Sequence, residues 1–147
     1  FSTIDSEFVQ DNFVRSDRRV LRGLHLQLPP KVQGKLVRVV RGAIFDVAVD
    51  LRKSSKTFGK YYKSILSEKN CRSIYIPPGF AHGFCTLEKE NYVIYSCTNY
   101  RDKNSEVGIK YNDKILNSSA NNNGLAPNLN IDLSHPIKKP NHTKPKI

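Results

Sequence analysis

Several residue types and features are scarce or missing in this chain, and each absence excludes a class of protein. The 147 residues include no tryptophan, no methionine and only three cysteines, Cys71, Cys85 and Cys97. The cysteines form no Cys-x-x-Cys pair, which argues against both a zinc knuckle and a disulfide framework. No apolar run approaches the roughly 18 residues of a membrane span, and no secretory signal is recognisable. We therefore expect a cytoplasmic protein with no membrane partner.

Methionine is missing even at the first position, which is Phe1, so we expect a fragment truncated at its N-terminus. The length still suffices for one domain with a buried core. From residue 117 onward the composition shifts to Asn, Ser, Gly and Pro, and then to lysine. We expect a folded domain over residues 1–116, followed by an Asn-rich loop and a basic tail over residues 117–147.

The formal net charge of +11 and the pI of about 9.7 favour an anionic partner, such as nucleic acid or a phosphorylated metabolite. Part of this charge lies in a proline-spaced tail after residue 137, which is typical of a solvated chain end. The sequence has neither zinc-finger spacing nor a platform of alternating basic and aromatic residues. We therefore expect no nucleic-acid partner, and an anionic small molecule is left as the ligand class.

The apolar pattern predicts an all-β protein, because short alternating runs are separated by Gly and Pro. Residues 43–52 alternate most clearly, and we expect the apolar side of this strand to point into the core. That side consists of Phe45, Val47, Val49 and Leu51. Arg41-Gly42 should form a tight hairpin turn after a strand over residues 35–40. With further strands near residues 61–66, 74–76 and 92–98, the sequence predicts an antiparallel jelly-roll barrel.

Two histidine-bearing runs are the most distinctive motifs. In the first, Arg22 precedes His25 by three residues. Side chains at that spacing point to opposite faces of a strand, unless Gly23 relaxes the pleat with a bulge or kink. The second run, residues 76–84, carries His82. Together the runs predict a barrel pocket with imidazole and cationic groups, suited to chemistry on an anionic substrate.

Six sequence blocks, in order, resemble those of the dTDP-4-dehydrorhamnose 3,5-epimerase family over roughly residues 6–115. The blocks are residues 8–12, 20–27, 33–37, 46–52, 57–59 and 78–84. The resemblance implies a cupin jelly roll that is homodimeric, free of metal and without a cofactor. It also implies a nucleotide-sugar substrate, dTDP-4-dehydro-6-deoxy-glucose, inverted at C3 and C5 to give dTDP-4-dehydro-L-rhamnose for cell-surface polysaccharide.

Inverting carbons beside a ketone requires a base on one face, a proton source on the other, and a group that stabilises the enolate. An imidazole suits the base role, because its ordinary pKa of about 6.5 lies near working pH. The resemblance implies that His25 is the base, that Tyr95 is the proton donor and that Lys35 faces the C4 oxygen. Substrate contacts implied in the same way are Arg22, His82, Gln10, Asp11, Asn12, Gln27 and Glu106.

A metal site is not expected, although many cupins bind a metal through a His-x-His pair. Here Gln27 stands two residues after His25, and an amide is a poor ligand for transition metals. No other histidine than His82 follows before Asp132, and no carboxylate stands at a suitable spacing.

Three departures from the family pattern concern activity. The block that normally opens the family domain is missing, and the late aspartate that orients the catalytic histidine has no clear counterpart. Asp132 is the remaining candidate for that role. The second tyrosine of the usual Asp-Tyr-Tyr is replaced, leaving Asn99-Tyr100-Arg101. Two alternatives therefore stand: an epimerase acting at one carbon or on another nucleotide sugar, and a truncated cupin that binds nucleotide sugar without turnover.

Overall fold

The computed structural model describes residues 4–109, which form nine strands and no helix. The expected Asn-rich loop, the basic tail and Asp132 lie outside the described residues, as does the expected domain boundary at residue 116. The strands are β1 (Gln10–Asp17), β2 (Leu21–Gln27), β3 (Lys35–Arg41), β4 (Ala43–Asp50), β5 (Tyr61–Ser67), β6 (Ser73–Ile76), β7 (Phe80–Thr86), β8 (Glu90–Cys97) and β9 (Glu106–Gly108).

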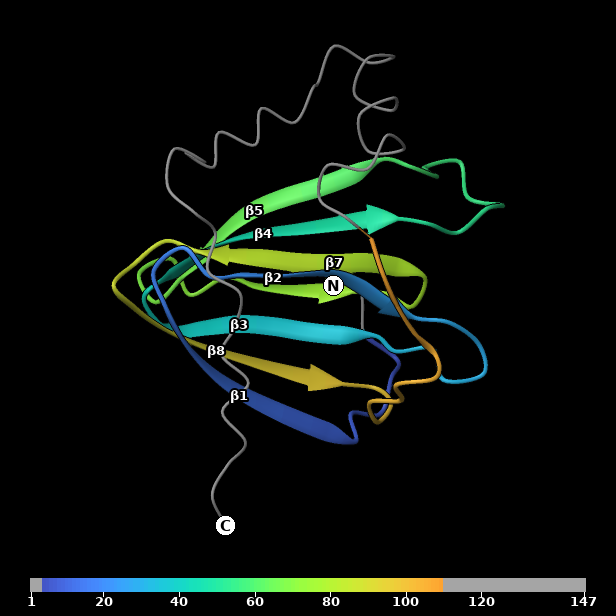
Figure 1. Cartoon of the computed structure of the whole chain (residues 1–147), viewed down its shortest axis with the longest axis horizontal. Coiled ribbons are helices and arrows are strands. Elements are labelled where there is room, and N and C mark those ends of the chain that lie inside the picture. Colours follow the sequence, from blue (N-terminus) through green and yellow to red (C-terminus); the bar gives the residue numbers. More distant parts are fainter. Residues whose placement is uncertain (1–3, 110–147) are drawn as a thin grey trace.

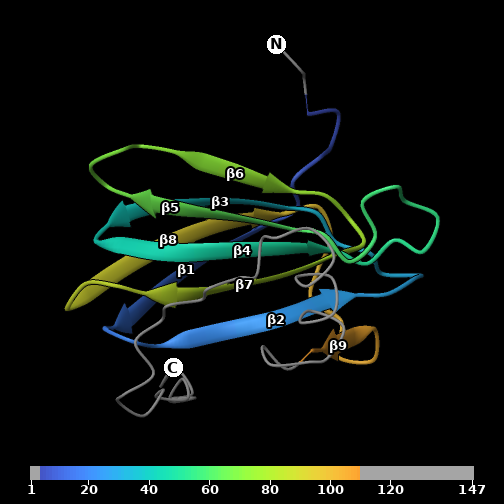
Figure 2. The ribbon, with the colours of Figure 1, turned by 90° about the horizontal axis from the view of Figure 1, so that it is seen from above.

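The strands form two antiparallel sheets with the topology of a jelly roll. The four-stranded sheet has the order β1-β8-β3-β6, and the five-stranded sheet has the order β5-β4-β7-β2-β9. Figures 1 and 2 show the two sheets as two layers, with β5, β4 and β7 side by side in one and β3, β8 and β1 in the other. Among the first eight strands β1 pairs with β8, β2 with β7, β3 with β6 and β4 with β5, which is the pairing of a jelly roll. The predicted fold class is confirmed.

The main core lies between the two sheets and is built from Val37, Ile44, Leu66 and Val93, with other apolar residues around them. The side of β4 that was expected to face a core does not face this main core, although Val47, Val49 and Leu51 belong to or pack against a second cluster. Ile44 and Ala48 face this core, together with two aspartates, Asp46 and Asp50. The acidic side of β4 therefore points inward, and the side with Phe45, Val47 and Val49 points away from the main core.

A second, smaller apolar cluster covers the other face of the five-stranded sheet. Val49 is buried there with Leu24, Leu26 and Ala81, and Val47 and Leu51 pack against it. Phe45 belongs to neither cluster. The alternation of β4 was therefore real, but both faces of the strand are apolar enough to be covered.

The turn at Arg41-Gly42 is present, but it is not a hairpin. β3 pairs with β6 and β8, whereas β4 pairs with β5 and β7, so the turn carries the chain from one sheet to the other. Gly42 has a φ of +79°, and a Cβ added there would lie 2.5 Å from the backbone oxygen of Glu90. Only glycine fits this position without strain.

Asp50 tolerates complete burial because its carboxylate is saturated with hydrogen bonds. Arg52 donates from Nε at 2.9 Å and from Nη2 at 2.8 Å, and the hydroxyls of Ser55 and Thr57 each donate at 2.6 Å. These bonds, that from Arg52 first, hold the pKa of Asp50 well below its usual range. The carboxylate therefore ties the loop after β4 to the end of the strand.

Candidate active site

A bulge in β2 places Arg22 and His25 on the same face of the sheet. Arg22 is paired with Phe84 and His25 with His82, and the register shifts between these pairs. Gly23, at a φ of +101°, lies so close to β7 that an added Cβ would be 2.5 Å from the backbone oxygen of His82. The bulge that the sequence required is therefore present. It turns both side chains inward and sends Leu24 to the outer cluster.

The facing sheet presents the other polar groups through simple alternation. Asn12 is the cross-strand partner of Tyr95, and Lys35 and Gln10 flank Cys97 on its two sides. Partners directly opposite each other in antiparallel strands share a face. All five side chains therefore point between the sheets, toward β2.

These groups line one cavity of about 420 Å³. Every predicted site residue except Asp11 and His82 lines it: Gln10, Asn12, Arg22, His25, Gln27, Lys35, Tyr95 and Glu106. Within residues 4–109, the side chains of His25, Lys35 and Tyr95 have no hydrogen-bond or ion-pair partner, so their polar atoms are available to a ligand.

Burial determines the charge states of the three unpartnered groups. Burial first, and then the nearby Lys35 ammonium, lower the pKa of His25 to about 4, so the imidazole is neutral at pH 7. Burial also lowers the pKa of Lys35, whose residue is only 6% exposed. It raises the pKa of Tyr95, so the phenol keeps its proton. The cavity therefore holds a neutral base and a protonated phenol on opposite sheets.

His82 on β7 is the cross-strand partner of His25, but it does not line the cavity. It is 4% exposed, and its Nε2 is 2.8 Å from Oδ2 of Asp46, which is fully buried in β4. Oδ1 of Asp46 has no hydrogen-bond partner within the described residues. The structure thus places His82 next to His25 in the sheet, bound to Asp46 and not open to the cavity. Asp46 was missed as the partner of His82, although an acid in an otherwise apolar strand was a signal.

Asp11 lies on the outer face of the four-stranded sheet, away from the cavity. Its neighbours Gln10 and Asn12 both line the cavity, and successive residues of a strand point to opposite faces. The carboxylate of Asp11 accepts a hydrogen bond from the hydroxyl of Ser96 at 2.5 Å, on that outer face. The structure does not bring Asp11 together with the other predicted residues.

Gln27 is held by the protein on both ends of its amide. Nε2 donates to the backbone oxygens of Lys31 at 2.6 Å and Tyr100 at 3.2 Å, and Oε1 accepts from the backbone N–H of Asp102 at 2.8 Å. Gln27 therefore joins two loops at the rim of the cavity.

Five further cavity residues were not predicted: Leu21 and Gly23, which flank Arg22 on β2, and three with polar or thiol side chains, Gln33, Cys97 and Arg101. Cys97 could have been found, because it stands two residues after Tyr95 on the same strand and so shares its face. Gln33 and Arg101 lie in loops, where no periodicity applies.

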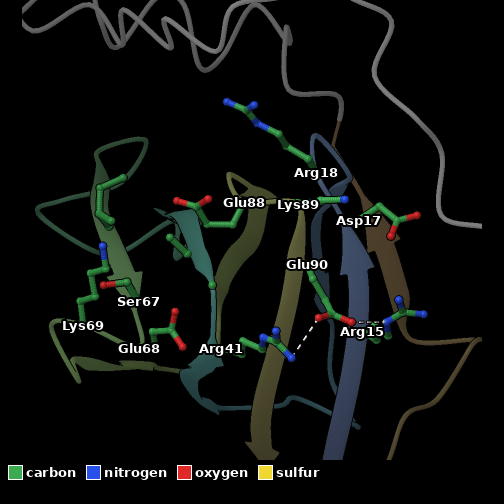
Figure 3. Close-up of a pocket in the computed structure, with 13 residues that line it drawn as sticks. Arg15, Asp17, Arg18, Arg41, Ser67, Glu68, Lys69, Glu88, Lys89 and Glu90 are labelled. Atoms are coloured by element: carbon green, nitrogen blue, oxygen red, sulfur yellow. Dashed lines mark hydrogen bonds and ion pairs between the residues drawn. The ribbon is translucent and has the colours of Figure 1, made fainter.

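A second, larger cavity of about 920 Å³ lies at the other end of the strands, around the turn at Gly42. Figure 3 shows that charged side chains of both signs surround it, and that Glu90 binds both Arg15 and Arg41. Because these charges are nearly balanced and largely exposed, this cavity has no clear preference for an anion.

In the part of the chain that the structure describes, no group of His, Cys, Asp or Glu side chains is arranged to hold a metal ion, and no helix could span a membrane.

The fold and the site together define a cupin-type jelly roll with a pocket of titratable side chains between its sheets. The family model described as dTDP-4-dehydrorhamnose 3,5-epimerase matches residues 1–134. The chain belongs to this family.

Similar proteins from several organisms support the same placement. The dTDP-4-dehydrorhamnose 3,5-epimerase of Shigella flexneri is 56% identical over 111 residues, which are 76% of this chain and 61% of that protein. A Legionella pneumophila epimerase, solved in complex with dTDP-4-keto-L-rhamnose, has a TM-score of 0.74 at 51% identity, covering 77% of this chain and 60% of that one. A Bacillus anthracis epimerase, solved with TDP and PPi bound, has a TM-score of 0.75 at 46% identity, covering 77% and 65%. The chain spans about 60% of the length of the Shigella flexneri and Salmonella typhimurium relatives, and 34% of that from Neisseria gonorrhoeae.

Proposed function

We propose that the cavity catalyses epimerisation at C3 and C5 of dTDP-4-dehydro-6-deoxy-glucose, giving dTDP-4-dehydro-L-rhamnose. The observation that supports this most is the set of three unpartnered groups in one cavity. His25 comes from β2 of one sheet, whereas Tyr95 and Lys35 come from β8 and β3 of the other. This arrangement provides a base and an acid on opposite sides of a bound sugar. The Lys35 ammonium stands on β3, next to the strand that carries the acid.

In the proposed reaction, neutral His25 removes the proton from a carbon next to the C4 ketone. The electrons of the C–H bond form an enolate, whose oxygen carries the negative charge that the Lys35 ammonium stabilises. Tyr95 then delivers its proton to the same carbon from the opposite face, and the configuration is inverted. The phenolate recovers a proton from water and His25 releases the one that it took, so no cofactor or metal is required.

The charge of the cavity supports a nucleotide-sugar substrate. Arg22, Lys35 and Arg101 line it, and Glu106 is the one carboxylate among the lining residues. Arg22 is held by a hydrogen bond from its Nε to the Ser16 hydroxyl at 3.2 Å, which leaves the rest of its guanidinium for a ligand. The Legionella and Bacillus relatives were solved with dTDP-sugar and with TDP and PPi, respectively. We therefore propose a dTDP-sugar as substrate.

Proton exchange with solvent tests this function directly. In deuterated water the chain should incorporate deuterium at both carbons that flank the ketone of the 4-keto sugar, as measured by mass spectrometry and NMR. Tyr95→Phe should keep this exchange but form much less inverted product, because abstraction by His25 precedes protonation by Tyr95. Tyr61→Phe, outside the cavity, is the matched control.

The number of exchanged positions separates the alternatives. Exchange at one carbon only would indicate a mono-epimerase. Exchange with a different nucleotide sugar, and none with this one, would show that the substrate is that other sugar. A chain that binds the nucleotide sugar and shows no exchange at either carbon would contradict an epimerase function and favour a binding protein.

We also propose that the chain is a homodimer. β1 is an open edge of the four-stranded sheet, and edge strands favour pairing. Phe13 on this strand is 63% exposed and lies beside Leu36 and Ile94 at a hollow on the outer face of the sheet. The chain should sediment as a dimer at micromolar concentration, and Phe13→Glu should shift it toward a monomer, whereas Tyr62→Glu on β5 should not. A monomeric mass for the unmodified chain would contradict this proposal.

We further propose that the protein works in the cytoplasm. All three cysteines are free thiols, and two of them, Cys85 and Cys97, are buried. Unpaired thiols fit a reducing compartment.

A further inference from the structure

Arg101 is a cavity residue that was not among the predicted site residues. Its side chain is 58% exposed and lines the cavity together with Glu106. Two hydrogen bonds join the pair: Nε to Oε2 at 2.7 Å and Nη2 to Oε1 at 3.1 Å. The hydrogen bond from Arg101 is the first cause of a lowered pKa of Glu106, so this carboxylate is ionised at neutral pH.

These two bonds use only one edge of the guanidinium. Nε and Nη2 form the edge that faces Glu106, whereas Nη1 and the second N–H of Nη2 form the other edge. Nη1 has no partner within the described residues. A guanidinium binds planar oxyanions through two parallel N–H groups, and its second edge has the same geometry as its first. Arg101 can therefore hold Glu106 and a second oxyanion at once.

The position of Arg101 relative to the cavity is also fixed from its backbone. Its N–H donates to Oε1 of Gln10 at 3.2 Å, and Gln10 lines the cavity from β1. The charge of Arg101 acts on His25, Lys35 and Tyr95, which places it in electrostatic range of the whole site. A side chain held at both its backbone and its guanidinium loses little further freedom when a ligand binds.

We propose that the free edge of Arg101 binds the diphosphate of the nucleotide sugar, while Glu106 holds the opposite edge. The proposal rests on the nucleotide-sugar substrate proposed above. It makes Arg101 a substrate-binding residue, and it makes Glu106 a positioning residue that orients the guanidinium. A diphosphate supplies the paired oxygens that a fork of this geometry binds.

Inorganic pyrophosphate is the simplest probe, because it contains the diphosphate without base or sugar. Its affinity for the full chain should be measured by titration calorimetry at fixed salt. Arg101→Gln should weaken binding about 10- to 100-fold, as expected when a charge-assisted hydrogen-bond pair is lost. Arg101→Lys should lose less affinity for pyrophosphate, because it keeps the positive charge and lacks only the paired N–H groups of the guanidinium. Arg72→Gln, an exposed arginine outside the cavity, should bind as the unmodified chain does.

The same variants separate this inference from the proposed function. If Arg101→Gln binds pyrophosphate as tightly as the unmodified chain, the inference is wrong, whether or not the chain exchanges deuterium. If the affinity falls as expected while the unmodified chain shows no exchange, the diphosphate site stands and the epimerase function does not. With an active chain, Arg101→Gln should raise KM by a similar factor and leave kcat nearly unchanged, since a diphosphate contact that is equally strong in the ground state and the transition state affects binding alone.

Discussion

Replacing His25 with alanine should lower the rate of deuterium incorporation beside the ketone by about 10²- to 10⁴-fold, the usual contribution of a general base. No other side chain that lines the cavity carries an imidazole, so nothing in the described part of the chain replaces it. Binding of pyrophosphate should persist in His25→Ala, because Arg22, Lys35 and Arg101 remain. Exchange at the unmodified rate in this variant would show that His25 is not the base.

The pH dependence of the unmodified chain provides a second measurement on the same residue. A His25 pKa of about 4 keeps the imidazole neutral throughout the range from pH 5 to 8. Because the neutral form is the active base, kcat/KM for exchange should stay level as pH falls from 8 to 5 and decrease only near pH 4. A midpoint at about 6.5, the value of an ordinary histidine, would contradict the depressed pKa.

Replacing Lys35 with methionine should lower the exchange rate by about 10²- to 10³-fold, as removal of a donor to a developing oxyanion does in other enzymes. Methionine keeps much of the buried volume and removes only the charge, so the strand should still pack. Lys63→Met, an exposed substitution on β5, is the matched control and should leave the rate unchanged.

The same substitution should also change the pH profile. The Lys35 ammonium is the second cause of the lowered His25 pKa, after burial. Without it, the pKa of His25 should rise, and the acid limb of kcat/KM should move to higher pH. If the plateau of kcat/KM falls but its acid limb does not move, Lys35 stabilises the enolate without lowering the pKa of His25. If the plateau is unchanged, Lys35 takes no part in the reaction.

The sequence predicted the fold class and most of the cavity, because both depend on period-two alternation and on short ordered blocks. Asn12, Tyr95 and Lys35 are brought together by strand pairing alone. Asp11 was predicted from the resemblance together with its neighbours Gln10 and Asn12. Three consecutive strand residues cannot all face one cavity, so this part of the prediction failed. The loop residues Gln33 and Arg101 required the structure, because a loop position depends on tertiary contacts.

Which side of β4 faces the main core could not be predicted from the sequence, since aspartates ordinarily face water. Asp46 and Asp50 are instead fully buried, and each has a partner: Asp50 binds Arg52, two residues further along the chain. For Asp46 that partner is His82, which stands 36 residues later in the chain. The apolar pattern within β4 contains no information about a partner so far along the chain.

The inward aspartates of β4 also have a consequence for how the barrel assembles. Both faces of this strand carry apolar residues, so hydrophobic burial alone discriminates little between the native pairing and one that is displaced by a single residue. A displaced strand would move Asp46 away from His82 and bury an uncompensated carboxylate, at a cost of about 3–5 kcal/mol. The Asp46 carboxylate thus favours the native alignment of β4 over a displaced one, because only the native alignment pairs it with His82.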